Sequence, residues 1–166
     1  MPKQLLLIRH AKSDWNNAGL KDFDRPLNKR GHSNAPEMAN RMVEQQIIPD
    51  LIVSSPALRA ITTATYFAEN WGIDQSKIQQ ENSIYEANVK SLLALVNQLD
   101  NQFDHVAMFG HNPGLTDFAN YLSDVNIYNM PTCSIVIIEF PFENWNEVSA
   151  ETGKVVLFDY PKSLDD

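Results

Sequence analysis

The sequence predicts a single domain with a three-layer α/β/α sandwich around a mostly parallel central sheet. Short apolar runs alternate with longer segments of helical periodicity, and this alternation is typical of helices covering a parallel sheet. The first run, residues 5–8, is continuously apolar, as expected of a strand buried on both faces. A length of 166 residues with 43% hydrophobic and 20% charged residues suits one core, so we expect residues 1–166 to form one domain.

Five further segments are predicted to be strands. Residues 51–54 and 105–109 resemble the first run and are expected inside the sheet. Residues 77–81 are predicted to form a short edge strand, and the last two strands are expected at residues 133–140 and 154–160. All of them are separated by turn residues or by helical patterns, which supports the same fold class.

A polar loop and a helix are predicted after the first strand. Residues 11–28 are polar and rich in Asp and Asn, and long loops at the mouth of a sheet often carry function. Asn28 is expected to cap the next helix, which runs to about residue 46. Pro36 interrupts its pattern, so we expect the helix to kink or restart there.

Two more helices are predicted to begin with a capping residue followed by proline. The pair Ser55-Pro56 is expected to start a helix that ends near Trp71, and Asn112-Pro113 is expected to start one that ends near Leu122. Between them, residues 89–99 form a helical pattern whose apolar face is core.

The charge and the cysteine count exclude several classes of function. A net charge of -8 argues against binding to nucleic acid or to anionic membranes, because phosphate backbones are held mainly by Lys and Arg. Cys133 is the only cysteine, so the chain can form no internal disulfide and no CxxC metal site. The apolar run at residues 5–8 is too short for a signal peptide or a membrane span. We expect a cytoplasmic monomer.

Basic residues follow three of the predicted strands at their carboxyl ends. They are Arg9 and His10 after the first strand, Arg59 after the second and His111 after the third. In open α/β sheets ligands bind in the crevice beyond these strand ends, so the side chains are expected to meet. The helix starts at Ser55 and Asn112 add backbone N–H groups and positive dipole ends, which favour an anion such as phosphate.

An imidazole among arginines is suited to phosphoryl transfer. Near neutral pH much of an unperturbed histidine is neutral and nucleophilic, and a second histidine can donate hydrogen bonds to the phosphoryl oxygens. Arginines neutralise the charge, so the chemistry needs mainly positioning and electrostatics. The sequence also has no HExxH or other compact metal-ligand spacing. We therefore expect neither a cofactor nor a metal.

The motifs at these positions resemble the histidine phosphatase superfamily, which has the phosphoglycerate mutase-like fold. They are LIRH at residues 7–10, SSPALRAITTA at residues 54–64 and GHNP at residues 110–113. Further matches are similar to the small SixA-type phosphohistidine phosphatases: RPLNKRG at residues 25–31, YEA at residues 85–87 and PKSL at residues 161–164. Ala11 is a departure, because the commonest superfamily motif has glycine after the histidine.

The resemblance implies a role for each matching residue. His10 would be the nucleophile that becomes phosphorylated, and Arg9, Arg59 and His111 would surround the phosphate. Arg25 would be the additional arginine of the loop, and Ser55 and Asn112 would also contact the phosphate or substrate. Glu86 lies where many relatives place the proton donor for the leaving oxygen, although SixA-type enzymes can lack a dedicated acid. The implied substrate is phosphohistidine on a protein, such as a histidine-phosphotransfer domain.

Other interpretations remain open at the level of sequence. One is a small-molecule or phosphoserine/phosphothreonine phosphatase with Glu86 as general acid, and another is a non-catalytic module that only binds phosphate. Arg25 lies near Asp22 and Asp24 in a stretch that could be a solvated charged surface. Trp15 could flank the site or pack, and the other two histidines, His32 and His105, are assigned to structure.

Overall fold

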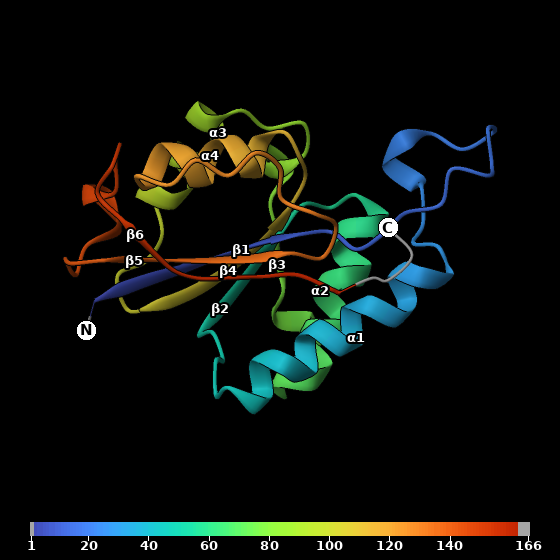
Figure 1. Cartoon of the computed structure of the whole chain (residues 1–166), viewed down its shortest axis with the longest axis horizontal. Helices are drawn as coiled ribbons and strands as arrows, with labels where there is room; N and C mark the ends of the chain where they lie inside the picture. Colours follow the sequence, from blue (N-terminus) through green and yellow to red (C-terminus); the bar gives the residue numbers. More distant parts are fainter. Residues whose placement is uncertain (1, 163–166) are drawn as a thin grey trace.

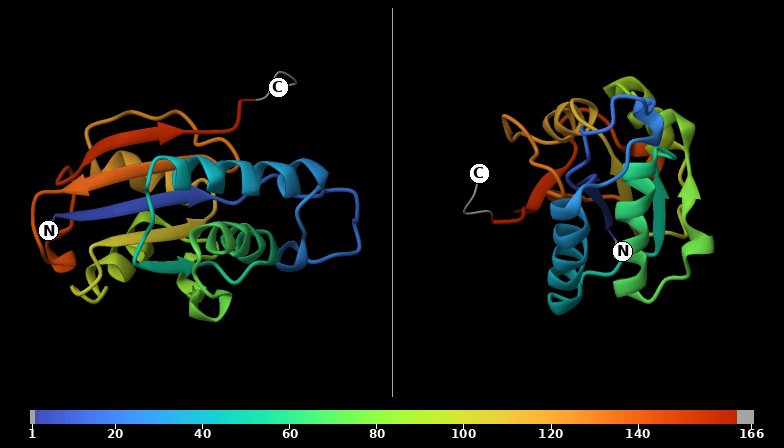
Figure 2. Two further views of the ribbon diagram at one scale, coloured as in Figure 1. Left: turned by 90° about the horizontal axis from the view of Figure 1, so that it is seen from below. Right: turned by 90° about the vertical axis from the view of Figure 1, so that its right-hand side faces the viewer.

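The six strands form one mixed sheet with the order β3-β2-β4-β1-β5-β6. The computed structural model describes residues 2–162. β1 pairs in parallel with β4, β4 with β2 and β2 with β3, whereas β5 is antiparallel to both β1 and β6 (Figure 2). The strands are β1 (Lys3–Arg9), β2 (Leu51–Ser54), β3 (Gln79–Gln80), β4 (His105–Gly110), β5 (Ile135–Phe140) and β6 (Lys154–Asp159). The mostly parallel sheet predicted from the sequence is confirmed.

Helices cover both faces of this sheet and complete the predicted three layers. α3 and α4 lie on one face, and α1 and α2 lie on the other (Figure 1). The helices are α1 (Lys29–Glu44), α2 (Leu58–Trp71), α3 (Val89–Asn97) and α4 (Gly114–Leu122), with short 3-10 turns η1 (Asp22–Asp24), η2 (Gln75–Lys77), η3 (Asn82–Ile84) and η4 (Trp145–Glu147). None of the helices in residues 2–162 is long and apolar enough to cross a membrane.

The continuous apolar run of β1 is explained by two cores, one on each face of the sheet. Leu5 and Leu7 pack into the cluster beneath α3 and α4, and Leu6 and Ile8 pack into the cluster beneath α1 and α2. All four side chains are buried, because successive residues of a strand point to opposite faces. β1 is therefore fixed from both sides, which defines the position of the residues that follow it.

The first helix, α1, starts where the sequence predicts but is not interrupted by its proline. Asn28 caps α1 as expected, its side chain accepting a hydrogen bond from the backbone N–H of Gly31. The helix continues through Pro36 to Glu44, so the predicted restart is wrong. A buried face that includes Ala35 before the proline and Met38 after it packs both halves into the same cluster. The match to PKSL at the end of the chain extends to residues 163–164, which lie outside the described residues.

The other two helices begin later in the chain than their predicted capping residues, Ser55 and Asn112. α2 begins at Leu58 with Ala57 at its N-cap, and α4 begins at Gly114 with Pro113 at its N-cap. Ser55 lies three positions before the first residue of α2, and its hydroxyl accepts from the N–H of Ala57 and contacts His111. Asn112 lies two positions before the first residue of α4, and its Oδ1 still accepts from the N–H of Thr116 (3.3 Å) in the first turn.

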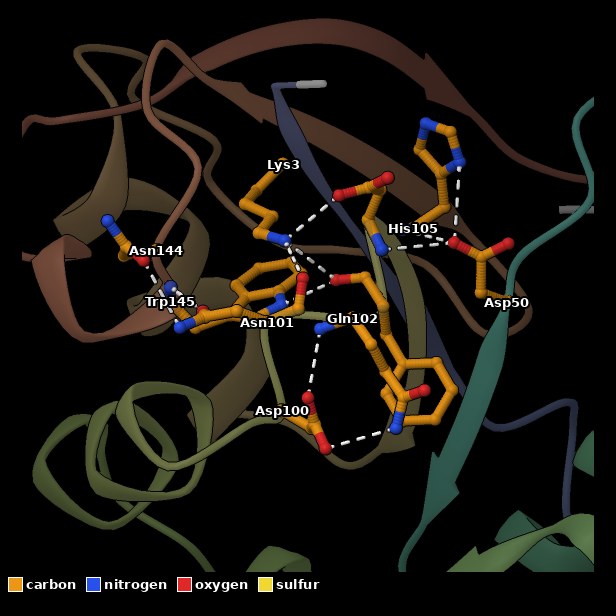
Figure 3. A network of polar contacts seen from close by, with 10 residues as sticks. Lys3, Asp50, Asp100, Asn101, Gln102, His105, Asn144 and Trp145 are labelled. Atoms are coloured by element: carbon orange, nitrogen blue, oxygen red, sulfur yellow. Dashed lines mark hydrogen bonds and ion pairs between the residues drawn. The ribbon is translucent and has the colours of Figure 1, made fainter.

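A buried lysine anchors the end of the sheet opposite to the start of α2. The ammonium group of Lys3 donates to the carbonyl oxygens of Asn101 (2.6 Å) and Phe103 (3.1 Å) and to Oδ1 of Asp104 (2.9 Å) (Figure 3). The indole of Trp145 lies 5.7 Å from this ammonium and donates to the same Phe103 carbonyl. Because a buried charge is costly unless it is fully hydrogen-bonded, this network fixes the amino-terminal end of β1.

Candidate active site

His10 directly follows β1, at the edge of the sheet where the parallel strands end. Its backbone N–H donates to the carbonyl of Gly110 (3.0 Å), the last residue of β4, and its own carbonyl accepts from the N–H of Cys133 (3.0 Å), two residues before β5. These bonds continue the hydrogen bonding of the sheet by one residue. The backbone of His10 is therefore held from two strands.

A cavity of about 310 Å³ opens beside His10 and collects most of the predicted residues. Its walls come from the end of β1, the loop of residues 11–28, the first turn of α2 and the loops that follow β4 and α4. The lining residues are Arg9, His10, Lys12, Ser13, Trp15, Asp22, Arg25, Arg59, His111, Asn112 and Thr132. A larger hollow of about 650 Å³ lies along α3, but no histidine or arginine lines it.

The His10 imidazole has a defined tautomer. Its Nδ1 lies 2.7 Å from the carbonyl oxygen of Ala11. Because a carbonyl can only accept, Nδ1 carries the proton and Nε2 keeps its lone pair. Burial, opposed by this hydrogen bond and reinforced by the positive neighbours, lowers the pKa of His10 to about 3. His10 is therefore a neutral imidazole with a free nucleophilic nitrogen at neutral pH.

His111 packs against His10 and is also neutral. The two ring centroids are 5.2 Å apart. Burial is the main cause that lowers the pKa of His111 to about 4, and the positive charge of Arg59 adds to it. The Nε2 of His111 lies 2.7 Å from the hydroxyl of Ser55, which fixes the ring, whereas its Nδ1 has no partner in the part of the chain that the structure describes. His111 therefore keeps one ring nitrogen for a ligand.

Three arginines converge on the cavity with one shared arrangement. The Nη1 of Arg9 donates to the carbonyl of Met130 (2.7 Å), and the terminal nitrogens of Arg25 and Arg59 donate to Asp22. The Nε of each arginine is buried and has no hydrogen-bond partner among residues 2–162. Unpaired buried N–H groups are costly, so each guanidinium is held at its tip while an edge remains available to an anion.

The loop of residues 11–28 supplies Arg25 with two more contacts. Its Nη1 donates to the hydroxyl of Ser13, and its guanidinium carbon lies 3.6 Å from the centroid of the Trp15 ring. Trp15 remains 74% exposed, so the indole covers Arg25 while presenting its own surface at the rim of the cavity. Arg25 is buried, which answers the open question of whether it belongs to a solvated surface.

Ser55 and Asn112 are close to the site but their polar groups are committed. Ser55 does not line the cavity; its hydroxyl lies behind His111 and accepts from the N–H of Ala57 (3.2 Å). Asn112 lines the cavity, but its amide nitrogen donates to Asn129 and to the Met130 carbonyl (both 3.0 Å). Both residues therefore position their neighbours and have little left to offer a phosphate.

Glu86, like Ser55, is a predicted site residue that does not line the cavity. It is exposed, and it lies in the left-handed region with φ of 54°. The neighbouring Tyr85 instead contacts two residues of the cavity wall. Its ring centroid is 5.5 Å from that of His111, and its hydroxyl donates to Asp22 (2.7 Å). His32 and His105, which were assigned to structure, also lie away from the cavity.

Sequence reasoning missed four residues of the cavity wall. They are Lys12, Ser13, Asp22 and Thr132. The first two follow His10 so closely in the chain that their place could have been inferred. The spacing Asp-x-x-Arg at residues 22–25 was a weaker signal, because it describes equally well an ion pair on a solvated turn. Thr132 had no signal, since it precedes a strand that bears no catalytic motif.

Ala11, which follows His10, is accommodated without backbone strain. Ala11 is buried and is not among the described non-glycine residues with positive φ. Its N–H donates to the hydroxyl of Thr63 (3.0 Å), which in turn donates to the carbonyl of Arg59 (2.8 Å). The methyl group therefore costs nothing here, and the backbone after His10 is tied to α2.

No group of three or more His, Cys, Asp or Glu in residues 2–162 is arranged to hold a metal ion. The one carboxylate on the cavity wall, Asp22, is engaged by arginines. The donors that face the cavity suit an anion and not a cation.

Comparison with known proteins agrees with this geometry. Residues 5–105 match the histidine phosphatase superfamily (branch 1). The chain belongs to this superfamily. Within it, a crystal structure from Agrobacterium tumefaciens, provisionally assigned as the phosphohistidine phosphatase SixA, has a TM-score of 0.82 at 26% identity, covering 98% of this chain and 100% of that one. The predicted resemblance to the SixA-type branch is thereby confirmed.

Other relatives share the fold or part of the sequence. The protein histidine phosphatase SixA in complex with tungstate shares the fold, with a TM-score of 0.80 at 20% identity over 95% of this chain and 96% of that one. An uncharacterised chloroplastic protein of Arabidopsis thaliana is 28% identical over 169 residues, which cover 91% of this chain and 72% of that protein. The chain spans about a quarter to a half of the curated phosphoglycerate mutases that it matches.

Proposed function

We propose that this protein is a metal-independent phosphatase that acts through a phosphohistidine intermediate on His10 and removes phosphate from phosphohistidine on a protein. The observation that carries the proposal is the neutral, singly protonated His10 imidazole beside three arginines whose tips are held and whose Nε groups are unpaired. Such fixed donors stabilise a phosphoryl group without reorganising during the reaction.

The reaction consists of two transfers at one phosphorus atom. In the first, the lone pair of His10 Nε2 attacks the phosphorus and the bond to the substrate nitrogen breaks, its electron pair leaving with the substrate imidazole. That imidazole departs as a neutral molecule because its other nitrogen is protonated in solution. In the second, a water oxygen attacks the phosphorus, the bond to Nε2 breaks, and inorganic phosphate leaves with restored His10. The guanidinium edges bind the phosphoryl oxygens throughout.

The protonation state of the site favours phosphohistidine over an alkyl phosphate. An alkoxide leaving group needs a proton, and that is the task of a carboxylic acid in many phosphatases. The carboxyl on the cavity wall is Asp22, whose pKa is lowered to about 2, chiefly by the hydrogen bond from Tyr85, so it is ionised. Glu86 lies outside the cavity. A leaving imidazole makes less demand on such an acid.

Exposed aromatic side chains beside the cavity support a protein substrate. Trp15 lies on Arg25 at the rim, and Phe23 packs edge-on against Tyr85 with ring centroids 5.3 Å apart. Tyr128 is fully exposed next to Asn129 and Met130, which bind Asn112 and Arg9. Exposed apolar groups around a polar pocket are typical of protein-binding surfaces.

A substrate panel tests this proposal. Phosphohistidine protein, phosphoserine and phosphotyrosine peptides and sugar phosphates are compared at neutral pH with a chelator present. We expect phosphohistidine to be turned over fastest, phosphate to be trapped on His10 by mass spectrometry, and His10→Ala to lose more than about 10³-fold in kcat. The matched control is His32→Ala, which removes an exposed imidazole outside the site.

Three outcomes would overturn parts of the proposal. Full turnover by His10→Ala would exclude the nucleophile, and loss of turnover with chelator would exclude metal independence. Release of no product from an activated aryl phosphate would indicate a module that only binds phosphate. Glu86→Gln is expected to leave all rates unchanged; a selective loss on an alkyl phosphate would instead favour the small-molecule or phosphoserine phosphatase.

A further inference from the structure

One carboxylate joins three segments of the chain at the cavity. Asp22 in η1 accepts from Arg25 at Oδ1 (3.2 Å), and at Oδ2 it accepts from Arg59 (3.0 Å) and from the hydroxyl of Tyr85 (2.7 Å). Its backbone carbonyl accepts a second bond from Arg59 (2.7 Å). The partners come from the loop of residues 11–28, from α2 and from the turn after η3. Asp22 thus accepts hydrogen bonds from both of these arginines.

The contacts with Asp22 use the terminal nitrogens of each guanidinium and not its Nε. Arg59 donates to Asp22 through both terminal nitrogens, and Arg25 donates through Nη2. Because the planar guanidinium has five N–H groups on three edges, binding at the tip leaves the edge that includes Nε available. Both Nε atoms are buried and have no protein partner. The carboxylate therefore orients these arginines without occupying all of their donors.

Arg9 shows the same principle with a different acceptor. Its Nη1 is held by the carbonyl of Met130, and its Nε is likewise buried and unpaired. A neutral carbonyl oxygen is sufficient to hold the guanidinium of Arg9. For Arg25 and Arg59, which repel each other, one negative charge placed between them also offsets the repulsion.

We propose that Asp22 is a positioning residue that fixes Arg25 and Arg59 for the phosphoryl oxygens, with Tyr85 holding the Asp22 carboxylate in place. This inference rests on the proposed phosphatase function and adds to it a residue that neither touches the phosphorus nor transfers a proton. The alternative is that the carboxylate only occupies the arginines until a phosphate displaces it. The two roles make opposite predictions for turnover, because loss of a positioning residue slows the reaction, whereas loss of a competitor does not.

Asp22→Asn separates the two roles when turnover and binding are both measured. We expect kcat to fall about 10- to 100-fold, because donors that must be placed before the reaction become mobile. The dissociation constant for tungstate, measured by calorimetry, is expected to change by less than about threefold, because lost orientation is offset by removal of a negative charge. Asp22→Glu is expected to recover part of kcat, since it restores the charge.

Two further variants complete the test. Asp24→Asn removes an exposed carboxylate from the same turn that does not line the cavity, and it is expected to leave kcat unchanged. Tyr85→Phe removes one donor to Asp22 and is expected to lower kcat about threefold, less than Asp22→Asn does. Circular dichroism and the thermal midpoint of each variant establish that it is folded.

Wild-type kcat for Asp22→Asn, or a higher kcat with tighter tungstate binding, would overturn the positioning role. An equal fall for Asp24→Asn would overturn it too, because it would show that the effect is not specific to the arginine contacts. If instead the wild-type protein forms no phospho-His10 and turns over no phosphorylated substrate, then the proposed phosphatase function itself fails. The two failures are thus distinguished by the wild-type measurement alone.

Discussion

Acidification should leave this enzyme active at a pH where ordinary histidines would be protonated. An unperturbed histidine with a pKa of about 6.5 is only about 10% neutral at pH 5.5, so an enzyme that depends on it loses about tenfold between pH 7.5 and 5.5. In this structure burial lowers the pKa of His10 to about 3 and that of His111 to about 4. Since a lowered pKa keeps the neutral form down to lower pH, both imidazoles stay neutral at pH 5.5.

The quantity to measure is kcat/KM between pH 4 and 9, because it reports ionisations of the free enzyme. We expect the value at pH 5.5 to lie within about twofold of that at pH 7.5, with the loss beginning only as the pH approaches 4. Two aryl phosphates whose second pKa values differ by about one unit distinguish an ionisation of the enzyme from one of the substrate. A midpoint that belongs to the substrate shifts between the two compounds, whereas a midpoint that belongs to the enzyme does not. A substrate-independent midpoint near pH 6.5 would refute the burial argument.

Two further predictions concern positions away from the reacting atoms. A Cβ on Gly31 would lie 2.2 Å from the carbonyl oxygen of Lys12, two residues after His10. Gly31→Ala should therefore lower the free energy of unfolding by about 1 to 3 kcal/mol, despite the higher helix propensity of alanine, and should also lower kcat. Urea unfolding and turnover measure the two effects, and Ser33→Ala at an exposed position of the same helix is the control. Lys3→Met should cost about 2 to 4 kcal/mol because it removes the buried donor of three hydrogen bonds. We expect kcat to stay at the wild-type value, since Lys3 is about 20 Å from His10 along β1, and a loss of activity in folded Lys3→Met would contradict this.

The fold was predictable because its strongest signal is local. Continuous apolar runs can be buried only between two layers, and residues 51–54 became β2 with the predicted bounds. The meeting of His10, Arg59 and His111 followed from one rule, that the carboxyl ends of parallel strands share an edge. That rule requires no knowledge of side-chain contacts, which is why it worked.

The errors arose where a side chain had a tertiary partner that competes with its local role. Ser55 and Asn112 accept from nearby backbone N–H groups, but the hydroxyl of Ser55 also contacts His111, and the amide nitrogen of Asn112 binds the chain at residues 129–130. Glu86 lies within the YEA match, but it adopts a positive φ, is exposed and does not line the cavity. Asp22 could not be identified, because its importance comes from partners at positions 59 and 85 that no local spacing reveals.

The arrangement divides charge and reactivity between two kinds of residue. Arginine keeps its proton at any pH that a folded protein tolerates, so the positive field in the cavity is constant. The same field, together with burial, disfavours protonation of the imidazoles and so keeps Nε2 of His10 nucleophilic. If histidines supplied the positive charge instead, phosphate binding would require the protonated form that cannot attack. Separate residues for the two tasks remove this conflict, and phosphate affinity should therefore change little as the pH falls from 8 to 5 except through the ionisation of phosphate itself.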